Sequence, residues 1–82
     1  MKVRLTHRAA RDLDDLSPYL QNIVRKQFEF LAVNLRHPSI RAKKYSERDD
    51  VWQERVNRDY RFFFRIVGDT YHILMIVPCL SG

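Results

Sequence analysis

The sequence is poor in residue types that several classes of protein need. It has a single cysteine, Cys79, which excludes an internal disulfide framework and a cysteine-based zinc cluster. It has only two glycines and three prolines, and no repeat, low-complexity tract or Gly/Ser-rich linker divides it. With 82 residues it is also too short for a dinucleotide-binding fold. We therefore expect one domain, residues 1–82, that works without a cofactor.

Long apolar stretches are missing as well. No run approaches the ~20 apolar residues that a membrane-spanning helix requires. The first residues, Met1 to Leu5, turn polar at once and do not resemble the apolar region of a secretory signal. These features predict a cytoplasmic protein that does not enter a membrane.

The chain does contain a core-forming set of residues and an excess of positive charge. Hydrophobic residues make up 45% of it, which argues against disorder. Fifteen Lys+Arg oppose ten Asp+Glu, a net charge of +5, and the excess lies between Arg36 and Arg65, away from an acidic cluster at residues 12–15. Such a segment attracts polyanions, namely nucleic acid, acidic protein segments or anionic lipid, unless it serves only for solubility.

Two helices are expected in the first half of the chain. Thr6 can cap a short helix, and Ser17 followed by Pro18 fits the cap and the first position of a longer one. Apolar side chains at helical spacing from Leu20 to Leu35 give the longer helix one buried face. His37-Pro38 should end it, because the residue before a proline disfavours helical backbone.

Strands are indicated by short alternating segments rich in β-branched and aromatic residues. They are Lys2–Thr6, Val51–Val56, Tyr60–Val67 and Tyr71–Val77. The segment Pro38 to Asp50 is polar and basic, a loop with one strand-like piece near Ala42 to Tyr45. The order β-α-α-β-β-β predicts an α+β fold in which two N-terminal helices pack on one face of a twisted, mostly antiparallel sheet. The last strand is apolar on both faces except at His72, which is typical of an internal strand.

The sheet face away from the helices is predicted to be basic. Its candidate RNA-binding and catalytic cations are Lys43, Lys44, Arg55, Arg58, Arg61 and Arg65. Guanidinium groups on a rigid sheet can grip phosphates with two hydrogen bonds each, and Phe63 or Tyr45 can stack a base. The alternative is an ordinary solvated surface. Trp52 alternates with this side and is expected in the core.

RNA cleavage on such a face needs three chemical groups. One takes the 2′-hydroxyl proton, another protonates the leaving oxygen, and a cation stabilises the charge that develops on the phosphorus. Arginine suits the third role because it stays protonated. No two histidines have metal-ligand spacing, so no metal site is expected. Glu54 alternates with Arg55 and should face the helices or an edge, more as an ion-pair partner than as a base.

Taken together, these segments resemble the RelE/ParE superfamily of bacterial toxin–antitoxin systems. The resemblance spans nearly the whole chain. It rests on the element order, on Trp52-Gln53-Glu54-Arg55-Val56 and above all on Asp59-Tyr60-Arg61-Phe62-Phe63-Phe64. A closing hairpin from Gly68 to Val77 follows, as it does in the family.

The resemblance implies one of two activities. RelE-like members are mRNA interferases that cut the message in the ribosomal A site without a metal, whereas ParE-like members poison DNA gyrase. In both groups an acidic, partly disordered cognate antitoxin wraps the toxin. We expect the first activity, a metal-independent mRNA endoribonuclease that inhibits translation and has the ribosome and mRNA as partners. The alternatives are gyrase inhibition and a catalytically degenerate module that only binds the antitoxin.

The same resemblance assigns roles to single residues. Arg61 matches the arginine that holds the scissile phosphate in RelE-like enzymes, and Arg55 falls where the preceding strand carries a basic catalytic or phosphate-binding residue. Cys79 stands where many RelE-like toxins have a histidine that acts as general acid or base, and no tyrosine follows it. Because a thiol forms weaker hydrogen bonds than an imidazole, either cleavage uses other groups or the activity is attenuated.

Overall fold

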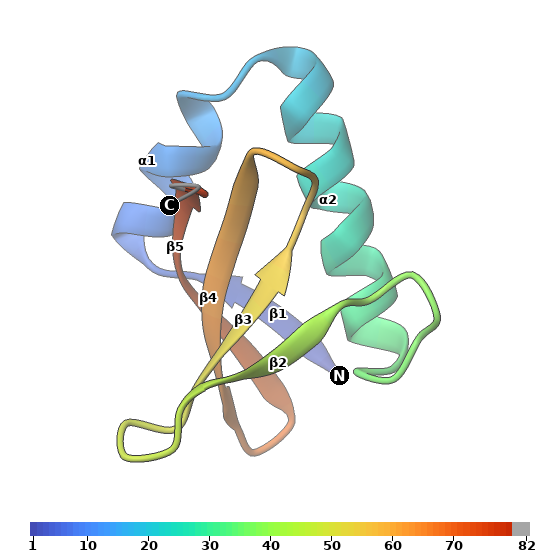
Figure 1. Ribbon diagram of the computed structural model, residues 1–82, viewed down its shortest axis with the longest axis vertical. Helices are drawn as coiled ribbons and strands as arrows, with labels where there is room; N and C mark the ends of the chain where they lie inside the picture. Colours follow the sequence, from blue (N-terminus) through green and yellow to red (C-terminus); the bar gives the residue numbers. More distant parts are fainter. Residues whose placement is uncertain (80–82) are drawn as a thin grey trace.

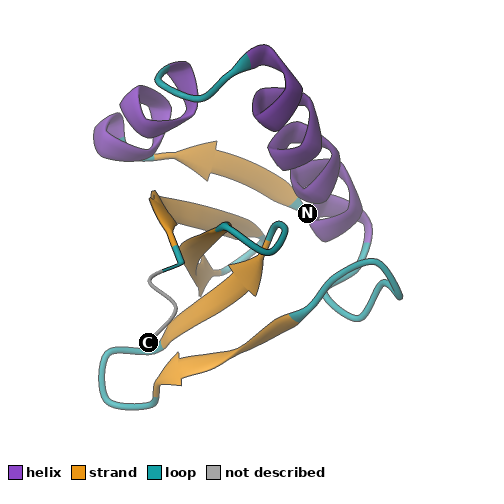
Figure 2. Cartoon of the chain, turned by 45° about the horizontal axis from the view of Figure 1, so that its top comes forward, coloured by secondary structure: helices purple, strands orange, loops and turns teal. Residues whose placement is uncertain are grey.

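The computed structural model describes residues 1–79, which form two helices and five strands. The elements are β1 (Lys2–Leu5), α1 (His7–Asp14), α2 (Pro18–Val33), β2 (Ala42–Ser46), β3 (Val51–Arg55), β4 (Tyr60–Val67) and β5 (Thr70–Pro78). Both helices lie on the same side of a twisted sheet (Figures 1 and 2). This confirms the α+β fold that the order of elements predicts.

The five strands form one sheet in the order β1-β5-β4-β3-β2. The pairs β2–β3, β3–β4 and β4–β5 are antiparallel, and only β1 runs parallel to its neighbour, β5. The first and last strands therefore lie side by side (Figure 1). β5 has a neighbour on each side, as its apolar composition predicts.

The strand-like piece near Ala42 to Tyr45 is a complete strand, β2, at the edge of the sheet. Its sequence, Ala-Lys-Lys-Tyr-Ser, carries little of the β-branched and aromatic character that identifies strands. Backbone pairing with β3 defines it instead, with Lys43 opposite Gln53 and Lys44 opposite Trp52. Because successive strand residues point to opposite faces, this register sends the two lysines to different sides of the sheet.

The helix starts follow the predicted caps. The Thr6 hydroxyl accepts a hydrogen bond from the backbone N–H of Ala9, and the Ser17 hydroxyl accepts one from Leu20. The end of α2 differs from the prediction, since the helix stops at Val33 before His37-Pro38. Asn34 is extended, and its side-chain oxygen accepts a hydrogen bond from the N–H of Arg36 at 2.9 Å. This local turn replaces a further turn of the helix, so α2 ends before His37-Pro38.

The core lies between the helices and the inner face of the sheet. Its buried residues are Ala9, Leu13, Val24, Phe28, Leu31, Val56, Phe62, Phe64, Tyr71, Ile73 and Ile76. Phe62 and Phe64 point inward from β4, and Phe28 of α2 meets Phe62 edge to face at 5.1 Å between ring centroids. Trp52 packs against this cluster, as expected.

Among the described residues no helix combines the length and apolarity needed to cross a bilayer.

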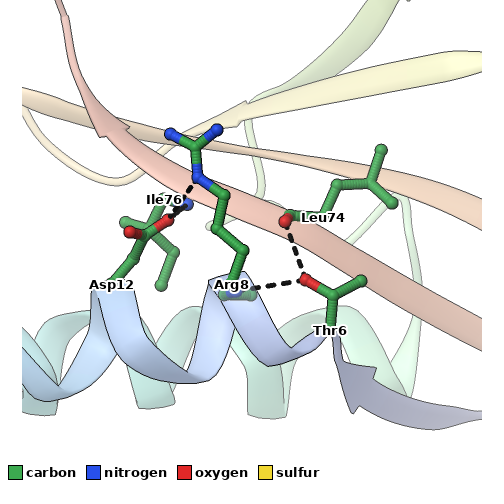
Figure 3. Close-up of polar contacts among 6 residues, drawn as sticks. Thr6, Arg8, Asp12, Leu74 and Ile76 are labelled. Atoms are coloured by element: carbon green, nitrogen blue, oxygen red, sulfur yellow. Dashed lines mark hydrogen bonds and ion pairs between the residues drawn. The ribbon is translucent and has the colours of Figure 1, made fainter.

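Side chains of the α1 cap and of α1 itself hydrogen-bond the backbone of β5 at and beside a bulge. Phe63 pairs with Met75 and Phe64 pairs with Ile73, so Leu74 has no opposite residue in β4. The Thr6 hydroxyl donates to the Leu74 carbonyl at 2.8 Å, and the Asp12 carboxylate accepts from the Ile76 N–H at 3.0 Å (Figure 3). Since β1 ends at Leu5, these two contacts continue the pairing along the edge of β5 and fix its C-terminal half.

Candidate nucleic-acid interface

A hollow of about 450 Å³ lies on the open face of the sheet, and most of its walls are basic. We call it the basic hollow. Its lining residues are Arg41, Lys43, Gln53, Arg55, Arg58, Arg61 and Cys79. Five of the seven candidate residues selected from the sequence therefore lie around one depression, although they come from β2, β3, β4, a turn and the end of β5.

The register of the sheet explains this convergence. Arg55 on β3 lies directly opposite Arg61 on β4. Arg41 immediately precedes Ala42, whose partner in β3 is Glu54, so Arg41 stands beside Arg55 at the start of β2. Three arginines thus form a row across three strands. Like charges opposite each other in a sheet are destabilising, so this row is poorly explained by folding alone.

Arg61 is the most firmly held cation of the row. Its Nη1 donates to the side-chain oxygen of Gln53 at 3.0 Å, and its guanidinium carbon lies 5.0 Å from the ring centroid of Phe63. The Nε atom is buried and has no hydrogen-bond partner among residues 1–79. A buried donor without a partner costs free energy, and an anionic ligand is one way to satisfy it.

The positive charge of the basic hollow is not neutralised from within the described part of the chain. The ion pairs found there are Arg8–Asp12 and Lys44–Asp50, and neither involves a residue of the hollow. Arginine keeps its charge at any ordinary pH. The hollow is therefore suited to an anion with several charges, such as a nucleic-acid backbone.

The two aromatic rings proposed for base stacking are not equivalent. Phe63 is only 8% exposed, and Tyr45 covers it edge to face at 4.7 Å between ring centroids. Tyr45 itself is 58% exposed. Phe63 therefore supports Arg61 from beneath, and Tyr45 is the ring that a base can reach.

Two predicted RNA-binding residues lie away from the basic hollow. Lys44 points to the other face of β2, where its Nζ pairs with Asp50 and lies 4.9 Å from the ring centroid of Trp52. The hydrogen bond to Asp50 raises the pKa of Lys44. Arg65 is exposed on the open face but pairs with His72, further along β4 than Arg61 and outside the hollow. Neither position could be assigned before the register was known.

Glu54 faces the helices, as alternation predicts, but it is neither a base in the hollow nor an ion-pair partner within residues 1–79. Its side chain is fully buried, and Oε1 accepts a hydrogen bond from the backbone N–H of Arg41 at 3.0 Å. With its amide nitrogen turned toward the carboxylate, Gln27 of α2 donates to Oε2. Burial raises the pKa of Glu54 to about 7, against a smaller lowering by the Arg41 contact.

Cys79 closes the basic hollow at the end of β5. Its backbone N–H donates to the carbonyl of Asp59 at 2.7 Å, which ties the end of β5 to the turn before β4. The tail that follows, Leu80 to Gly82, lies outside the described residues. Within residues 1–79 no group of three or more His, Cys, Asp or Glu side chains is arranged to hold a metal ion.

Arg41 is a candidate that the sequence does not single out, because it lies in a loop before a weak strand. In the sequence Arg41 is only one of many basic residues between Arg36 and Arg65. Gln53 was also absent from the candidates, although it shares the strand face of Arg55. Its role as a hydrogen-bond acceptor for Arg61 depends on the pairing of β3 with β4.

The chain is similar to known toxins in sequence and in structure. Residues 3–78 match the family described as ParE toxin of type II toxin–antitoxin system, parDE. No curated protein matches the chain. A RelBE2 toxin–antitoxin complex from Mycobacterium tuberculosis contains a chain that is similar at 24% identity and a TM-score of 0.73, with 94% of this chain and 95% of that chain covered.

Two further solved structures share the fold. The isolated E. coli RelE toxin is similar with a TM-score of 0.77 at 10% identity, covering 99% of this chain and 86% of that chain. The YoeB/ParE toxin from Agrobacterium tumefaciens is similar with a TM-score of 0.70 at 14% identity, covering 95% of this chain and 98% of that chain. These likenesses concern the fold, whereas the family match covers nearly the whole sequence. The chain therefore belongs to the ParE toxin family of the RelE/ParE superfamily and is a toxin of a toxin–antitoxin system.

Proposed function

We propose that this toxin is a ribosome-dependent mRNA endoribonuclease that inhibits translation. The row of Arg41, Arg55 and Arg61 carries the proposal, because it is a preformed site for phosphate that lacks a carboxylate partner among the described residues. Arg61 supports it further through its fixed orientation and its unpartnered Nε. Translating ribosomes are the source of the substrate, which agrees with the cytoplasmic location expected from the sequence.

In this proposal the arginines act on the phosphate and other groups move the protons. Arg61 and Arg55 stabilise the negative charge that grows on the phosphorane oxygens as the 2′-oxygen attacks phosphorus. The 2′-hydroxyl loses its proton, the bond from phosphorus to the 5′-oxygen breaks, and that oxygen takes up a proton. The products are a 2′,3′-cyclic phosphate and a 5′-hydroxyl, so the reaction needs no further reactant.

The proton-transfer groups are few in this hollow. Among its described lining residues only Lys43 and Cys79 can exchange a proton, because arginine remains charged. Lys43 and Arg58 are placed to bind the phosphates that flank the cleaved bond, and Tyr45 to stack a base. Arg65, further along β4, would contact RNA only outside the hollow.

A cognate antitoxin is the proposed protein partner. The similar M. tuberculosis structure is itself a toxin–antitoxin complex. For this chain an acidic, partly disordered segment complements the unneutralised arginines, and the edge strand β2 offers backbone groups for pairing. Because such a partner binds only the folded toxin, it should raise the thermal stability of the complex.

Gyrase inhibition is the second candidate, and the match to the ParE toxin family is the observation that favours it. A third reading, a degenerate module that only binds its antitoxin, rests on Cys79 in place of a histidine. Both alternatives use the same basic face for a different partner. They differ from the first proposal because neither requires RNA cleavage.

Primer extension on mRNA in programmed ribosomes tests the three readings. We expect cuts at the A-site codon with the native protein and with Arg65→Ala, and their loss with Arg61→Ala. Arg65 is the matched control because it is an exposed arginine of the same strand outside the hollow. Uncut message with gyrase-linked DNA breaks would instead assign the second function. Intact message and DNA with tight antitoxin binding would assign the third.

A further inference from the structure

A second hollow adjoins the basic hollow at the side where β2 begins. It also has a volume of about 450 Å³, and we call it the edge hollow. Three arginines, Arg41, Arg55 and Arg58, line both hollows and form a positively charged ridge between them. The remaining polar walls of the edge hollow come from α2, the loop after it and the β3–β4 turn. They are Gln27, Ser39 and Asn57.

The walls of the edge hollow offer hydrogen-bonding groups beside the charge. The Asn57 side-chain oxygen accepts from the N–H groups of Asp59 at 2.8 Å and Tyr60 at 2.9 Å, which leaves its amide nitrogen as the donor for a ligand. Ser39 is exposed and adds a hydroxyl group. A phosphate between arginines, with amide and hydroxyl groups next to it, is a chemical environment suited to a nucleotide of single-stranded RNA.

The buried carboxylate of Glu54 links two residues that line the edge hollow. It accepts hydrogen bonds from the backbone N–H of Arg41 and, with the amide turned toward it, from the side chain of Gln27. The same Gln27 amide donates to the Ser39 carbonyl at 3.2 Å. Because these contacts come from the protein itself, the hollow is shaped before any ligand arrives, which reduces the entropic cost of binding.

We propose that the edge hollow is a second nucleotide subsite, which binds the RNA residue next to the cleaved one. The arginine ridge grips the phosphate between the two subsites. This inference rests on the proposed function, and it predicts a preference for RNA strands long enough to reach both hollows. A strand that fills only the basic hollow should be insensitive to changes at Ser39.

Fluorescence anisotropy with uncleavable, labelled 2′-O-methyl uridylates tests this proposal. The probes are a mononucleotide, 2′-O-methyluridine 3′-phosphate, which can fill only one hollow, and a tetranucleotide with three internal phosphates. Ser39→Asp places a carboxylate in the edge hollow, and Asn22→Asp, on the exposed part of α2, adds the same charge outside both hollows. We expect Ser39→Asp to weaken tetranucleotide binding roughly tenfold and mononucleotide binding by about twofold or less. Asn22→Asp should leave both within about twofold.

Asn57→Asp shows whether the effect of Ser39→Asp comes from the added charge or from a local structural change at Ser39. Asn57→Asp keeps the oxygen that accepts from Asp59 and Tyr60, so it preserves the turn while adding negative charge, and it should repeat the selective loss. Equal effects of Ser39→Asp and Asn22→Asp on the tetranucleotide would overturn the subsite. So would unchanged RNA binding by Ser39→Asp together with weakened binding of a polyglutamate peptide, because the hollow would then accept an acidic polypeptide.

Arg61→Ala distinguishes failure of the second subsite from failure of the proposed RNA function. If it abolishes binding of both probes while Ser39→Asp shows no selectivity, the second subsite is wrong and the RNA function stands. If neither probe depends on Arg61, the basic hollow is not the RNA site and both proposals fail.

Discussion

The Asp12 carboxylate on α1 accepts a hydrogen bond from the backbone N–H of Ile76 on β5, 64 positions away in the sequence (Figure 3). β1 is too short to pair with this part of β5, so a helix side chain satisfies the strand edge where a backbone carbonyl would normally do so. Arg8 forms an ion pair with the same carboxylate, with its Nε atom 3.5 Å from Oδ2 of Asp12. The contact holds the part of β5 that leads to Cys79.

Removing this carboxylate should weaken the fold. Asp12→Ala leaves the half-buried N–H of Ile76 without a partner, and we expect the free energy of unfolding to fall by about 1–3 kcal/mol. Asp14→Ala, an exposed aspartate of the same helix, is the matched control and should change it by less than about 0.5 kcal/mol. Urea unfolding of both variants provides the measurement, and equal stabilities would remove Asp12 from its structural role.

Glu54 should make stability depend on pH. Its pKa in the folded protein is about 7, above the ordinary value of 4.5, so between these values the folded state holds a proton that the unfolded state releases. The contribution of Glu54 to stability is therefore fully present below pH 4.5 and is lost as the pH rises through about 7. The loss amounts to as much as about 3 kcal/mol.

Glu54→Gln isolates this effect, because glutamine keeps an oxygen for the Arg41 N–H but cannot ionise. The difference in unfolding free energy between variant and native protein should grow in favour of the variant from pH 5 to pH 7. Urea titrations across this range measure it. Parallel pH profiles for the two proteins would show that Glu54 does not titrate in this window.

The cross-strand pair of Arg55 and Arg61 should lower the folding stability and strengthen RNA binding. Arg55→Gln removes a like-charge repulsion, and we expect a gain of about 0.2–1 kcal/mol in stability, most clearly at low salt. The same variant should bind RNA more weakly, with a smaller dependence of affinity on salt, because one phosphate contact is lost. Arg25→Gln, an exposed arginine on α2, is the control and should affect neither property. A variant that loses both stability and binding would mean that Arg55 is structural.

Cys79 offers a test of the proton-transfer step. Cys79→His places an imidazole, a better acid and base near neutral pH, at the wall of the basic hollow. We expect faster cleavage of ribosome-bound mRNA, roughly tenfold or more by the usual contribution of such groups. Single-turnover cleavage rates, compared with those of Cys79→Ala, measure the effect. A histidine variant no faster than the native protein would place the general acid elsewhere.

The sequence predicted those features that depend on local patterns. Thr6 and Ser17 are recognisable caps, and the alternation of Phe62 and Phe64 with Arg61 assigns the two faces of β4 without a structure. The family resemblance placed Arg61 and Cys79 in one site, and in the structure they line the same hollow. The caps and the strand faces needed only local residue preferences and the periods of helices and strands, whereas the placing of Arg61 with Cys79 in one site came from the resemblance.

The features that the sequence did not predict depend on the pairing of distant segments. The register of β2 decides which of Lys43 and Lys44 faces the basic hollow, and the importance of Arg41 follows from its place beside β3. The bulge at Leu74 shifts the alternation of β5 by one residue, which no single-strand pattern reveals. The burial of Phe63 similarly depends on Tyr45, a residue of another strand.

The parallel pairing of β1 with β5 has a consequence for how the toxin is made. Val3 can pair only after Tyr71 has been synthesised, and the Thr6–Leu74 contact joins residues 68 positions apart. Closing such a long loop is entropically costly and slows folding. Because Cys79 then completes the basic hollow, a nascent chain on the ribosome cannot form this hollow until the chain as far as Cys79 has emerged. The topology itself therefore delays formation of the basic hollow during the protein's own translation.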